Sequence, residues 1–242
     1  MGAYGGPVAG WYPDPAGSGS LRWWDGLSWS SRLAAPTPPA PNLDLEGEEA
    51  AARWARAALL VAIPSQIAGW ALMRVWMADF RDQIESGGSI EEARQFGGTG
   101  LAVLDQLPNA VAGVTAVLFL IWFFRSASNA HKLGLPATRS PAAGVAGFLV
   151  PVINLWWPYQ STRDLLPAGH PDRPLVLRWF LLWVVGGAVS FMMVVASMFL
   201  DSGAGWALVA VPAALTTLAG LAARQVVANA LAAHQVLASR RY

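Results

Sequence analysis

Four long apolar runs are the feature that most constrains how this chain of 242 residues can fold. The runs cover Ala57–Met73, Leu101–Phe124, Leu177–Leu200 and Ala204–Ala223. Each is close to or longer than the ~17–25 residues that an α-helix needs to cross a bilayer. We therefore predict an all-α membrane bundle in contact with the lipid bilayer, whose four spans cover about residues 55–77, 101–124, 177–200 and 204–223.

The low content of charged residues is consistent with this prediction. Charged residues make up 13% of the chain, against about 25% in a typical soluble domain. The net charge of +1 argues against a nucleic-acid partner, because nucleic-acid binders usually carry a strongly basic surface. The sequence holds no cysteine, which excludes disulfide bonds, thiolate catalysis and cysteine-ligated metals.

Composition divides the chain into three zones. Residues 1–35 form a small tryptophan-rich module, and residues 36–49 form a linker that is first proline-rich and then acidic. Proline-rich segments favour the extended polyproline conformation, so we expect this linker to act as a spacer. Residues 50–242 form the helical membrane domain.

The distribution of Arg and Lys predicts the orientation of the spans. With four spans and a cytoplasmic N-terminus, 13 of these residues lie on the cytoplasmic side and 3 on the other, namely Arg74, Arg81 and Arg94. Cytoplasmic loops of membrane proteins carry an excess of Lys and Arg, so this orientation is favoured. We also expect the second and fourth span helices to continue past the membrane surface, over Arg125–Leu133 and Arg224–Leu237.

A further apolar segment, at residues 141–159, leaves the number of spans open. Two glycines and two prolines interrupt it, and the polar Asn154 lies near its middle. Irregular backbone at membrane depth is tolerated where protein or a water-filled cavity covers it. We therefore predict a re-entrant or half-inserted segment; the alternative is a fifth span, which would move the C-terminal arginines to the other side of the membrane.

The sequence carries no recognisable catalytic motif. It contains no Walker loop, no His-Glu-x-x-His, no Gly-x-Ser-x-Gly and no Rossmann fingerprint. His131 and His234 both follow cytoplasmic helix ends and could meet, but interfacial histidines without a ligand role are more common. We therefore expect no enzymatic activity, no catalytic residue, no cofactor and no bound metal. The amides of Gln66, Asn109 and Asn154 are costly to leave unpaired in hydrocarbon, so we expect them to form hydrogen bonds between helices.

The pair Asp25-Gly26 predicts a β-hairpin inside the tryptophan-rich module, because this dipeptide is a strong signal for a two-residue turn. Such a turn would place Trp24 opposite Leu27 and Arg22 opposite Trp29. The preceding chain would fold back through the turn at residues 14–19 and cover one face of the hairpin.

Four tryptophans lie in this module, and so thin a structure cannot bury all of them. At least one indole should therefore be exposed, where it suits a proline-rich peptide or the membrane surface. The candidate partner-binding residues are Trp11, Tyr12, Arg22, Trp23, Trp24, Asp25 and Trp29.

Two sets of motifs carry a resemblance to known families. Residues 11–15 read WYPDP and residues 24–29 read WDGLSW, which resembles a short N-terminal domain of unknown function found on bacterial membrane proteins. Residues 148–160 read FLVPVINLWWPYQ, and with Phe124-Arg125, Asn129 and Arg163-Asp164 they resemble an uncharacterised family of multi-pass bacterial membrane proteins. The membrane motif residues that this resemblance singles out as candidates are Arg125, Asn129, Pro151, Asn154, Pro158, Tyr159 and Gln160.

These observations support one leading hypothesis and one rival. The resemblances imply an integral protein of the bacterial inner (plasma) membrane, with a cytoplasmic aromatic module and no implied activity. The leading hypothesis is a non-enzymatic adaptor or scaffold whose module binds a cytoplasmic or membrane protein. The rival is a component of a small-molecule or lipid transporter or channel, in which Pro151–Tyr159 lines the path.

Overall fold

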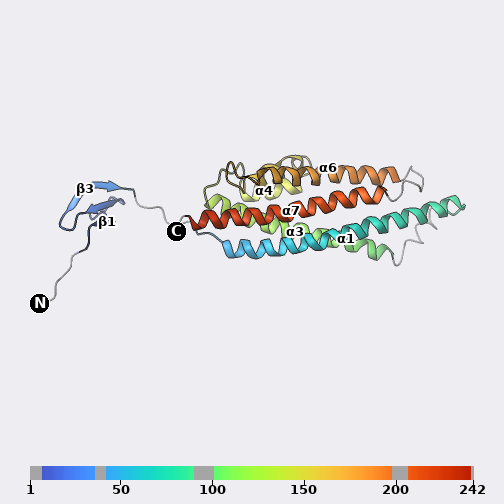
Figure 1. Ribbon diagram of the computed structural model, residues 1–242, viewed down its shortest axis with the longest axis horizontal. Coiled ribbons are helices and arrows are strands. Elements are labelled where there is room, and N and C mark those ends of the chain that lie inside the picture. The colour runs from blue at the N-terminus through green and yellow to red at the C-terminus, as the bar shows by residue number, and fades with distance from the viewer. Residues whose placement is uncertain (1–6, 36–41, 90–100, 198–206, 241–242) are drawn as a thin grey trace. The chain divides into compact units, whose positions relative to one another are not determined.

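The computed structural model describes residues 7–35, 42–89, 101–197 and 207–240, and the chain divides into two compact units, Met1–Pro41 and Asn42–Tyr242. The first unit is an antiparallel sheet of strands β1 (Gly10–Pro13), β2 (Leu21–Trp24) and β3 (Trp29–Ala34), in the order β1-β2-β3 (Figure 1). The predicted hairpin is present, and the chain before it folds back as predicted and adds a third strand.

The register of the hairpin differs from the prediction. Trp24 lies opposite Trp29, not Leu27, and Arg22 lies opposite Leu33, with an irregularity between the two pairs. The turn is longer than two residues because the Asp25 side chain accepts hydrogen bonds from the backbone amides of Leu27 (2.7 Å) and Ser28 (2.6 Å). A side chain that satisfies two turn amides favours the longer loop over the short Asp-Gly turn.

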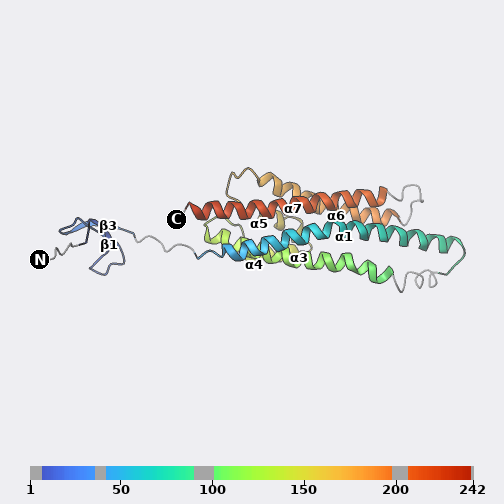
Figure 2. The ribbon, with the colours of Figure 1, turned by 60° about the horizontal axis from the view of Figure 1, so that its bottom comes forward.

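The second unit is a bundle of long helices that lie side by side in both ribbon views (Figures 1 and 2). Its elements are α1 (Leu45–Glu85), α3 (Leu101–Lys132), α4 (Pro141–Leu149), η1 (Ile153–Leu155), α5 (Trp157–Arg163), α6 (Arg173–Ser197) and α7 (Ala207–Ser239). Helix α1 packs against both α3 and α7, and α7 packs against α6. Among the described residues, contacts between α3 and α6 are few.

Four of these helices are long and apolar enough to cross a membrane, which confirms the predicted number of spans. They cover Leu45–Glu85, Gln106–Lys132, Arg173–Met193 and Val209–Ser239. Helices α3 and α7 continue past their apolar runs as predicted, to Lys132 and Ser239. Residues 198–206, where the third span was predicted to end and the fourth to begin, lie outside the described residues.

Helix α1 begins earlier than the sequence suggested, inside the stretch interpreted as linker (residues 36–49). Asp44 caps the helix, since its side chain accepts a hydrogen bond from the amide of Gly47, and Glu46 and Glu48 occupy the first turn. A capping carboxylate and acidic residues in the first turn both stabilise a helix N-terminus. The acidic half of the predicted linker is therefore the start of the first span helix.

The segment at residues 141–159 forms two short helices instead of a fifth span. Helix α4 has nine residues and α5 has seven, and nine helical residues extend only about 14 Å. The break lies between Val150 and Trp156, where the 3-10 turn η1 joins the two helices. A straight fifth crossing is excluded by this geometry, in agreement with the prediction of a segment that does not span.

The two glycines predicted to interrupt this segment instead permit close packing. Gly144 and Gly147 are buried inside α4. A Cβ atom added at Gly144 would lie 2.8 Å from the ring of Phe123, and one at Gly147 would lie 2.8 Å from Cβ of Trp157. Both distances are too short for a side chain, so glycine lets α4 approach α3 on one side and α5 on another.

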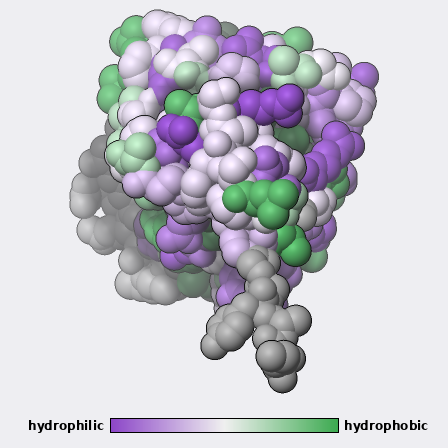
Figure 3. Space-filling model, turned by 90° about the vertical axis from the view of Figure 1, so that its left-hand side faces the viewer, coloured by the Kyte–Doolittle hydropathy of each residue, from purple (hydrophilic) through white to green (hydrophobic). Residues whose placement is uncertain are grey.

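Aromatic rings fill the space between α3, α4 and α6. Phe119 of α3 lies 5.7 Å from Phe148 of α4 and 5.8 Å from Trp179 of α6, measured between ring centroids. Apolar side chains on the outer surfaces of the spans are more than half exposed, for example Val117 and Phe191. In Figure 3 the coloured residues that face the viewer are mostly hydrophilic or neutral, with hydrophobic ones as separate patches.

Candidate functional site

The two faces of the sheet hold the predicted aromatic residues in separate sets. On one face, the rings of Trp24 and Trp29 meet edge to face with centroids 5.1 Å apart, and Tyr12 meets Trp29 at 6.3 Å. On the other face, Trp11 and Trp23 form an edge-to-face pair at 5.5 Å. Such pairs add about 0.5–1.5 kcal/mol each beyond the burial of their area, so they stabilise a sheet that is too small to form a large core.

Two of the four tryptophans remain partly exposed, as predicted. Trp11 is 44% exposed and Trp29 is 40% exposed. Two apolar neighbours of Trp29 are also exposed, namely Leu27 in the turn and Leu33 on the same strand. Tyr12 and Trp24 are less exposed, and their polar atoms donate hydrogen bonds to the carbonyls of Val8 and Pro7.

The charged candidate residues of the module have structural roles. The Asp14 side chain accepts hydrogen bonds from the Ser18 hydroxyl, the Ala16 amide and the Arg22 guanidinium, the last at 2.8 Å. The Ser18 hydroxyl, with the Ala16 amide and Arg22, holds the pKa of Asp14 below its usual range. Asp14 thus closes the β1–β2 loop and orients Arg22, which lies opposite Leu33 and not opposite Trp29 as predicted.

Asp25, the remaining charged candidate, closes the second turn. Its side chain accepts hydrogen bonds from the amides of Ser28 and Leu27 and from the Ser28 hydroxyl. The amides of Ser28 and Leu27 lower the pKa of this carboxyl. The aspartates of both sequence motifs therefore shape the loops of the module.

In the membrane domain, Asn154 ends helix α4. Its side-chain amide donates a hydrogen bond of 3.0 Å to the carbonyl of Phe148, and its backbone amide donates to the carbonyl of Val150. These bonds satisfy carbonyl groups that the end of α4 would otherwise leave free. Asn154 therefore bonds within its own segment, not to another span as predicted, and Pro151 lies exposed at the adjacent turn. Gln66 does bond between helices, to the carbonyl of Pro108.

The residues that follow fix helix α5 to its neighbours. Pro158 is fully buried at the start of α5, and the Tyr159 ring packs on Phe180 of α6 with centroids 5.8 Å apart. The Gln160 side chain accepts a hydrogen bond of 2.6 Å from Arg139, whose guanidinium lies 4.3 Å from the centroid of a Trp157 ring. Within the described residues, these motif side chains are all engaged in packing or hydrogen bonds.

Arg125 and Asn129 of α3 hold the start of α1. Arg125 forms an ion pair of 2.6 Å with the carboxylate of Asp44, and both side chains are about half exposed. Asn129 is buried; its side-chain oxygen accepts from the amide of Asp44, and its nitrogen donates to the carbonyl of Asp44 and to the carboxylate of Glu48. These two motif residues therefore supply partners for the first turn of the first span helix.

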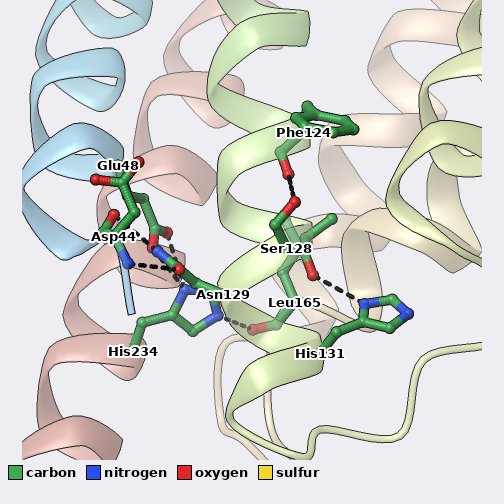
Figure 4. Close-up of polar contacts among 9 residues, drawn as sticks. Asp44, Glu48, Phe124, Ser128, Asn129, His131, Leu165 and His234 are labelled. Atoms are coloured by element: carbon green, nitrogen blue, oxygen red, sulfur yellow. Dashed lines mark hydrogen bonds and ion pairs between the residues drawn. The ribbon is translucent and has the colours of Figure 1, made fainter. Parts of the chain in front are cut away.

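A buried pair of titratable residues, Glu48 and His234, completes this cluster and was not predicted (Figure 4). Both side chains are fully buried, and Nδ1 of His234 lies 2.8 Å from Oε1 of Glu48. On its other side, Nε2 of His234 lies 2.9 Å from the carbonyl of Leu165. The cluster thus joins the start of α1, the end of α3, the end of α7 and Leu165, two residues after α5.

The polar atoms of the buried pair all have hydrogen-bond partners. Nδ1 of His234 faces the Glu48 side chain and Nε2 faces the Leu165 carbonyl. Glu48 also accepts a hydrogen bond from the Asn129 side chain. Such satisfied polar atoms are the condition for stable burial of titratable groups.

Helical spacing in the sequence contained a signal for this pair. His234 follows Val227 by seven residues and Ala230 by four, which places it on the buried stripe of α7. Glu48 precedes Ala52 by four residues and Ala55 by seven, on the buried stripe of α1. A titratable residue on an apolar stripe requires a partner from a facing helix.

The arrangement fits a structural role better than metal binding. His131, which was expected to be able to meet His234, instead lies 2.9 Å through Nδ1 from the carbonyl of Ala127. Over residues 7–35, 42–89, 101–197 and 207–240, no group of three His, Asp or Glu side chains is placed to hold a metal ion.

Fold and sites together define a multi-pass helical membrane protein with a small aromatic β-module near its N-terminus. Its membrane unit matches the family described as domain of unknown function DUF4328 over residues 88–235, and its module matches the protein of unknown function DUF2510 over residues 9–42. The chain belongs to the DUF4328 family, and the predicted resemblance to two uncharacterised families is confirmed. No curated protein and no solved structure matches the chain.

Proposed function

We propose that this protein is a non-enzymatic membrane adaptor, in which the helical bundle anchors a small aromatic module that binds a protein partner. The observation that carries the proposal is the exposure of Trp29, with the apolar residues Leu27 and Leu33, on a small sheet that also exposes Trp11 on its other face. Exposed aromatic residues dominate the binding energy of many protein interfaces.

The surface around Trp29 suits an extended apolar or proline-containing peptide. The Tyr12 ring meets the Trp29 ring edge to face, and Leu33 is exposed further along the same strand as Trp29. Proline-rich peptides dock on aromatic surfaces of this kind because their extended conformation is largely preformed. β3 lies at an edge of the sheet, so a bound peptide could also pair with its backbone.

The bundle supports the anchoring role. Its buried polar cluster is internally satisfied, and the motif residues from Pro158 to Gln160 are engaged in packing. A cavity between the spans is lined by Phe148 and Leu149, while residues 151–159 do not contribute to it. Among the described residues nothing favours a transport path along Pro151–Tyr159, so we do not propose transport.

The proposed location is the bacterial inner membrane, with the N-terminus in the cytoplasm. The arginine-rich ends of α1, α3, α6 and α7 meet at one end of the bundle, where Asp44 contacts Arg125 and Glu48 contacts His234. The opposite end carries Arg74 and Arg81 among the described residues. Excess positive charge on one side favours the cytoplasm for that side.

Cysteine labelling in right-side-out membrane vesicles tests this orientation, because the sequence holds no native cysteine. Ser239→Cys lies at the arginine-rich end and Ser86→Cys at the other. A membrane-impermeant maleimide should label Ser86→Cys from outside and reach Ser239→Cys only after the membrane is opened. The reverse pattern would place the module outside the cytoplasm.

Photo-crosslinking of the full-length chain in native membranes tests the adaptor role. Trp29 is replaced by p-benzoylphenylalanine, and the same replacement at Ala16, exposed in the β1–β2 loop, is the control. We expect a defined protein adduct from position 29 and none from position 16, with mass spectrometry identifying the partner. If position 29 forms adducts only with lipid, the module binds the membrane surface and the adaptor proposal fails.

A further inference from the structure

A cavity of about 490 Å³ lies among the four span helices. Its walls come from the middle of α1, α3, α6 and α7, and one end of α4 contributes Phe148 and Leu149. The volume falls within the about 300–1,000 Å³ that small-molecule pockets usually occupy. The family descriptions and the proposed adaptor role assign nothing to it.

The packing of the helices leaves this cavity without a direct α3–α6 contact along most of its length. Among the described residues, the backbones of α3 and α6 make few close approaches, and the two helices meet through side chains such as Phe119 and Trp179 and through α4. Those contacts lie towards the arginine-rich end, where the rings of Phe119, Phe148, Trp179 and Trp183 close the cavity. Gly187 lines the cavity on α6, is exposed, and has nothing within 4 Å of an added Cβ atom.

The cavity is elongated along the helices. Along α1 its lining runs from Leu59 to Trp70, a rise of about 16 Å. Its walls are mostly apolar, so an elongated apolar group that lies parallel to the spans suits it.

The polar groups of the lining are unevenly distributed along the cavity. The Gln66 amide donates to the Pro108 carbonyl, and the Thr115 hydroxyl donates to the Val111 carbonyl, so both are satisfied. Trp70, at the end of the cavity far from the aromatic closure, has a buried Nε1–H without a hydrogen-bond partner among the described residues. One turn further on, Nε of Arg74 is likewise buried without a partner.

Trp70 and Arg74 lie at a depth that matches the boundary between the hydrocarbon core of the bilayer and the lipid headgroups. Arg56 and Arg74 of α1 are separated by 18 residues, or about 27 Å of helix, close to the ~30 Å thickness of the hydrocarbon core. Trp70 lies about 6 Å inside Arg74. This is the level at which the ester carbonyl groups of a phospholipid meet its chains, with the phosphate just outside.

We propose that the cavity holds one acyl chain of a membrane phospholipid, which enters sideways between α3 and α6. The end of the chain reaches the rings of Phe148 and Trp179, an ester carbonyl accepts the hydrogen bond of Trp70, and the phosphate lies beside Arg74. The apolar lining suits the acyl chain. The donors of Trp70 and Arg74 suit the ester carbonyl and the phosphate, which are the hydrogen-bond acceptors of the lipid.

Two photoreactive phosphatidylglycerol probes test this in vesicles that contain the full-length chain. One probe carries a diazirine near the end of one acyl chain, and the other carries it near the ester. The first should label peptides with Phe148 and Trp179, and the second should label the peptide around Trp70. If both probes label only outward-facing positions such as Val117 and Phe191, the cavity holds no lipid chain and the proposal is overturned.

A matched pair of variants adds a second measurement. Gly187→Phe fills the cavity, whereas Gly113→Phe places the same ring on an exposed part of α3 outside the lining, where an added Cβ also has nothing within 4 Å. Cavity labelling should be lost in Gly187→Phe and kept in Gly113→Phe. Equal labelling in both contradicts the proposal, and if Gly187→Phe does not fold, the probe positions in the wild-type chain still decide.

Competition with free oleate distinguishes an acyl chain of a phospholipid from that of a free fatty acid. Oleate should not compete with the phospholipid probes for the cavity, because a fatty acid has no glycerol phosphate to place beside Arg74. Complete displacement by oleate would overturn the assignment to a phospholipid.

Trp70→Phe tests the proposed hydrogen bond to the ester, because it keeps an aromatic ring and removes the donor. It should reduce labelling by the ester-proximal probe more than Trp54→Phe, a change at an exposed indole elsewhere on α1.

Discussion

The sheet and the bundle each depend on a carboxylate that holds a cationic or titratable partner, but the two pairs lie in different surroundings. In the sheet, Asp14 bonds Arg22; the Asp14 side chain is 1% exposed, but the Arg22 side chain is 27% exposed, so water reaches one of the two partners. In the bundle, Glu48 bonds His234 and both side chains are fully buried. The comparison shows that a similar contact shapes a loop in one unit and joins distant helices in the other.

The consequence for stability follows from burial. Exposed ion pairs contribute about 0–1 kcal/mol, because water screens them and solvates either partner alone. Removal of one partner of a buried pair costs about 3–5 kcal/mol, because the other partner is left uncompensated in the interior. Substitutions at the two places should therefore differ strongly in effect, and the following measurements test this in order of expected size.

The largest effect is expected for His234→Ala. The free energy of unfolding of the bundle in detergent should fall by about 3–5 kcal/mol, since Glu48 then lacks its partner in the core. His131→Ala is the matched control, because His131 lies exposed at the same end of the bundle. Equal losses in the two variants would show that the buried pair has no special role.

The next effect is expected where α4 approaches α3 through glycine. Gly144→Ala should lower the free energy of unfolding by about 1–3 kcal/mol, because the new methyl group meets the buried ring of Phe123. Gly113→Ala, with open space around it, is the control and should be neutral or slightly stabilising. Thermal unfolding of both variants followed by circular dichroism measures the difference.

A smaller effect is expected for the exposed ion pair next to the buried cluster. Arg125→Ala should cost less than about 1 kcal/mol despite the short contact to Asp44, since both side chains are about half exposed. Asn129→Ala, one turn away, should cost about 1–3 kcal/mol because it leaves the buried Glu48 side chain without its donor and the partly buried backbone of Asp44 without its partner. Chemical denaturation measures the free energy of unfolding of both variants. Equal losses would contradict the expectation that the buried partner contributes more than the exposed one.

The smallest effect concerns pH and should be confined to the sheet. The pKa of Asp14 is lowered in the folded module from its ordinary value of 3.8. Its stabilisation is therefore fully present above about pH 4 and is lost as the pH falls through the lowered pKa. The indole NMR signals of Trp11 and Trp29 in the intact chain should shift towards unfolded positions in that range, and Asp14→Asn should abolish this dependence. A transition at neutral pH would contradict this role of Asp14.

Long-period patterns in the sequence predicted the bundle well. The apolar runs give the four spans, and the prolines near Asn154 indicate the break between α4 and α5. These features depend on neighbouring residues and on the thickness of the bilayer, so local sequence is sufficient to identify them.

The errors arose where a side chain acts on a partner that local patterns do not reveal. The hairpin register was wrong because Asp25 binds two turn amides, which the Asp-Gly signal does not anticipate. The start of α1 was missed because its acidic residues resembled a solvated linker, although Glu48 is buried against His234. The prediction that at least one indole is exposed is confirmed for Trp11 and Trp29, whereas Arg22 and Asp25 hold the loops of the module through their side-chain hydrogen bonds.

The link between Glu48 and His234 also has a consequence for biosynthesis. The two residues are 186 positions apart, so at about 5–20 residues per second the ribosome needs roughly 10–40 s to make the histidine after the glutamate. During that interval the first helix can enter the bilayer while its carboxylate stays hydrated at the surface. The contact between Glu48 and His234 therefore forms only after the last helix has been made. A chain truncated before His234 would insert its first helices into the bilayer without forming this contact.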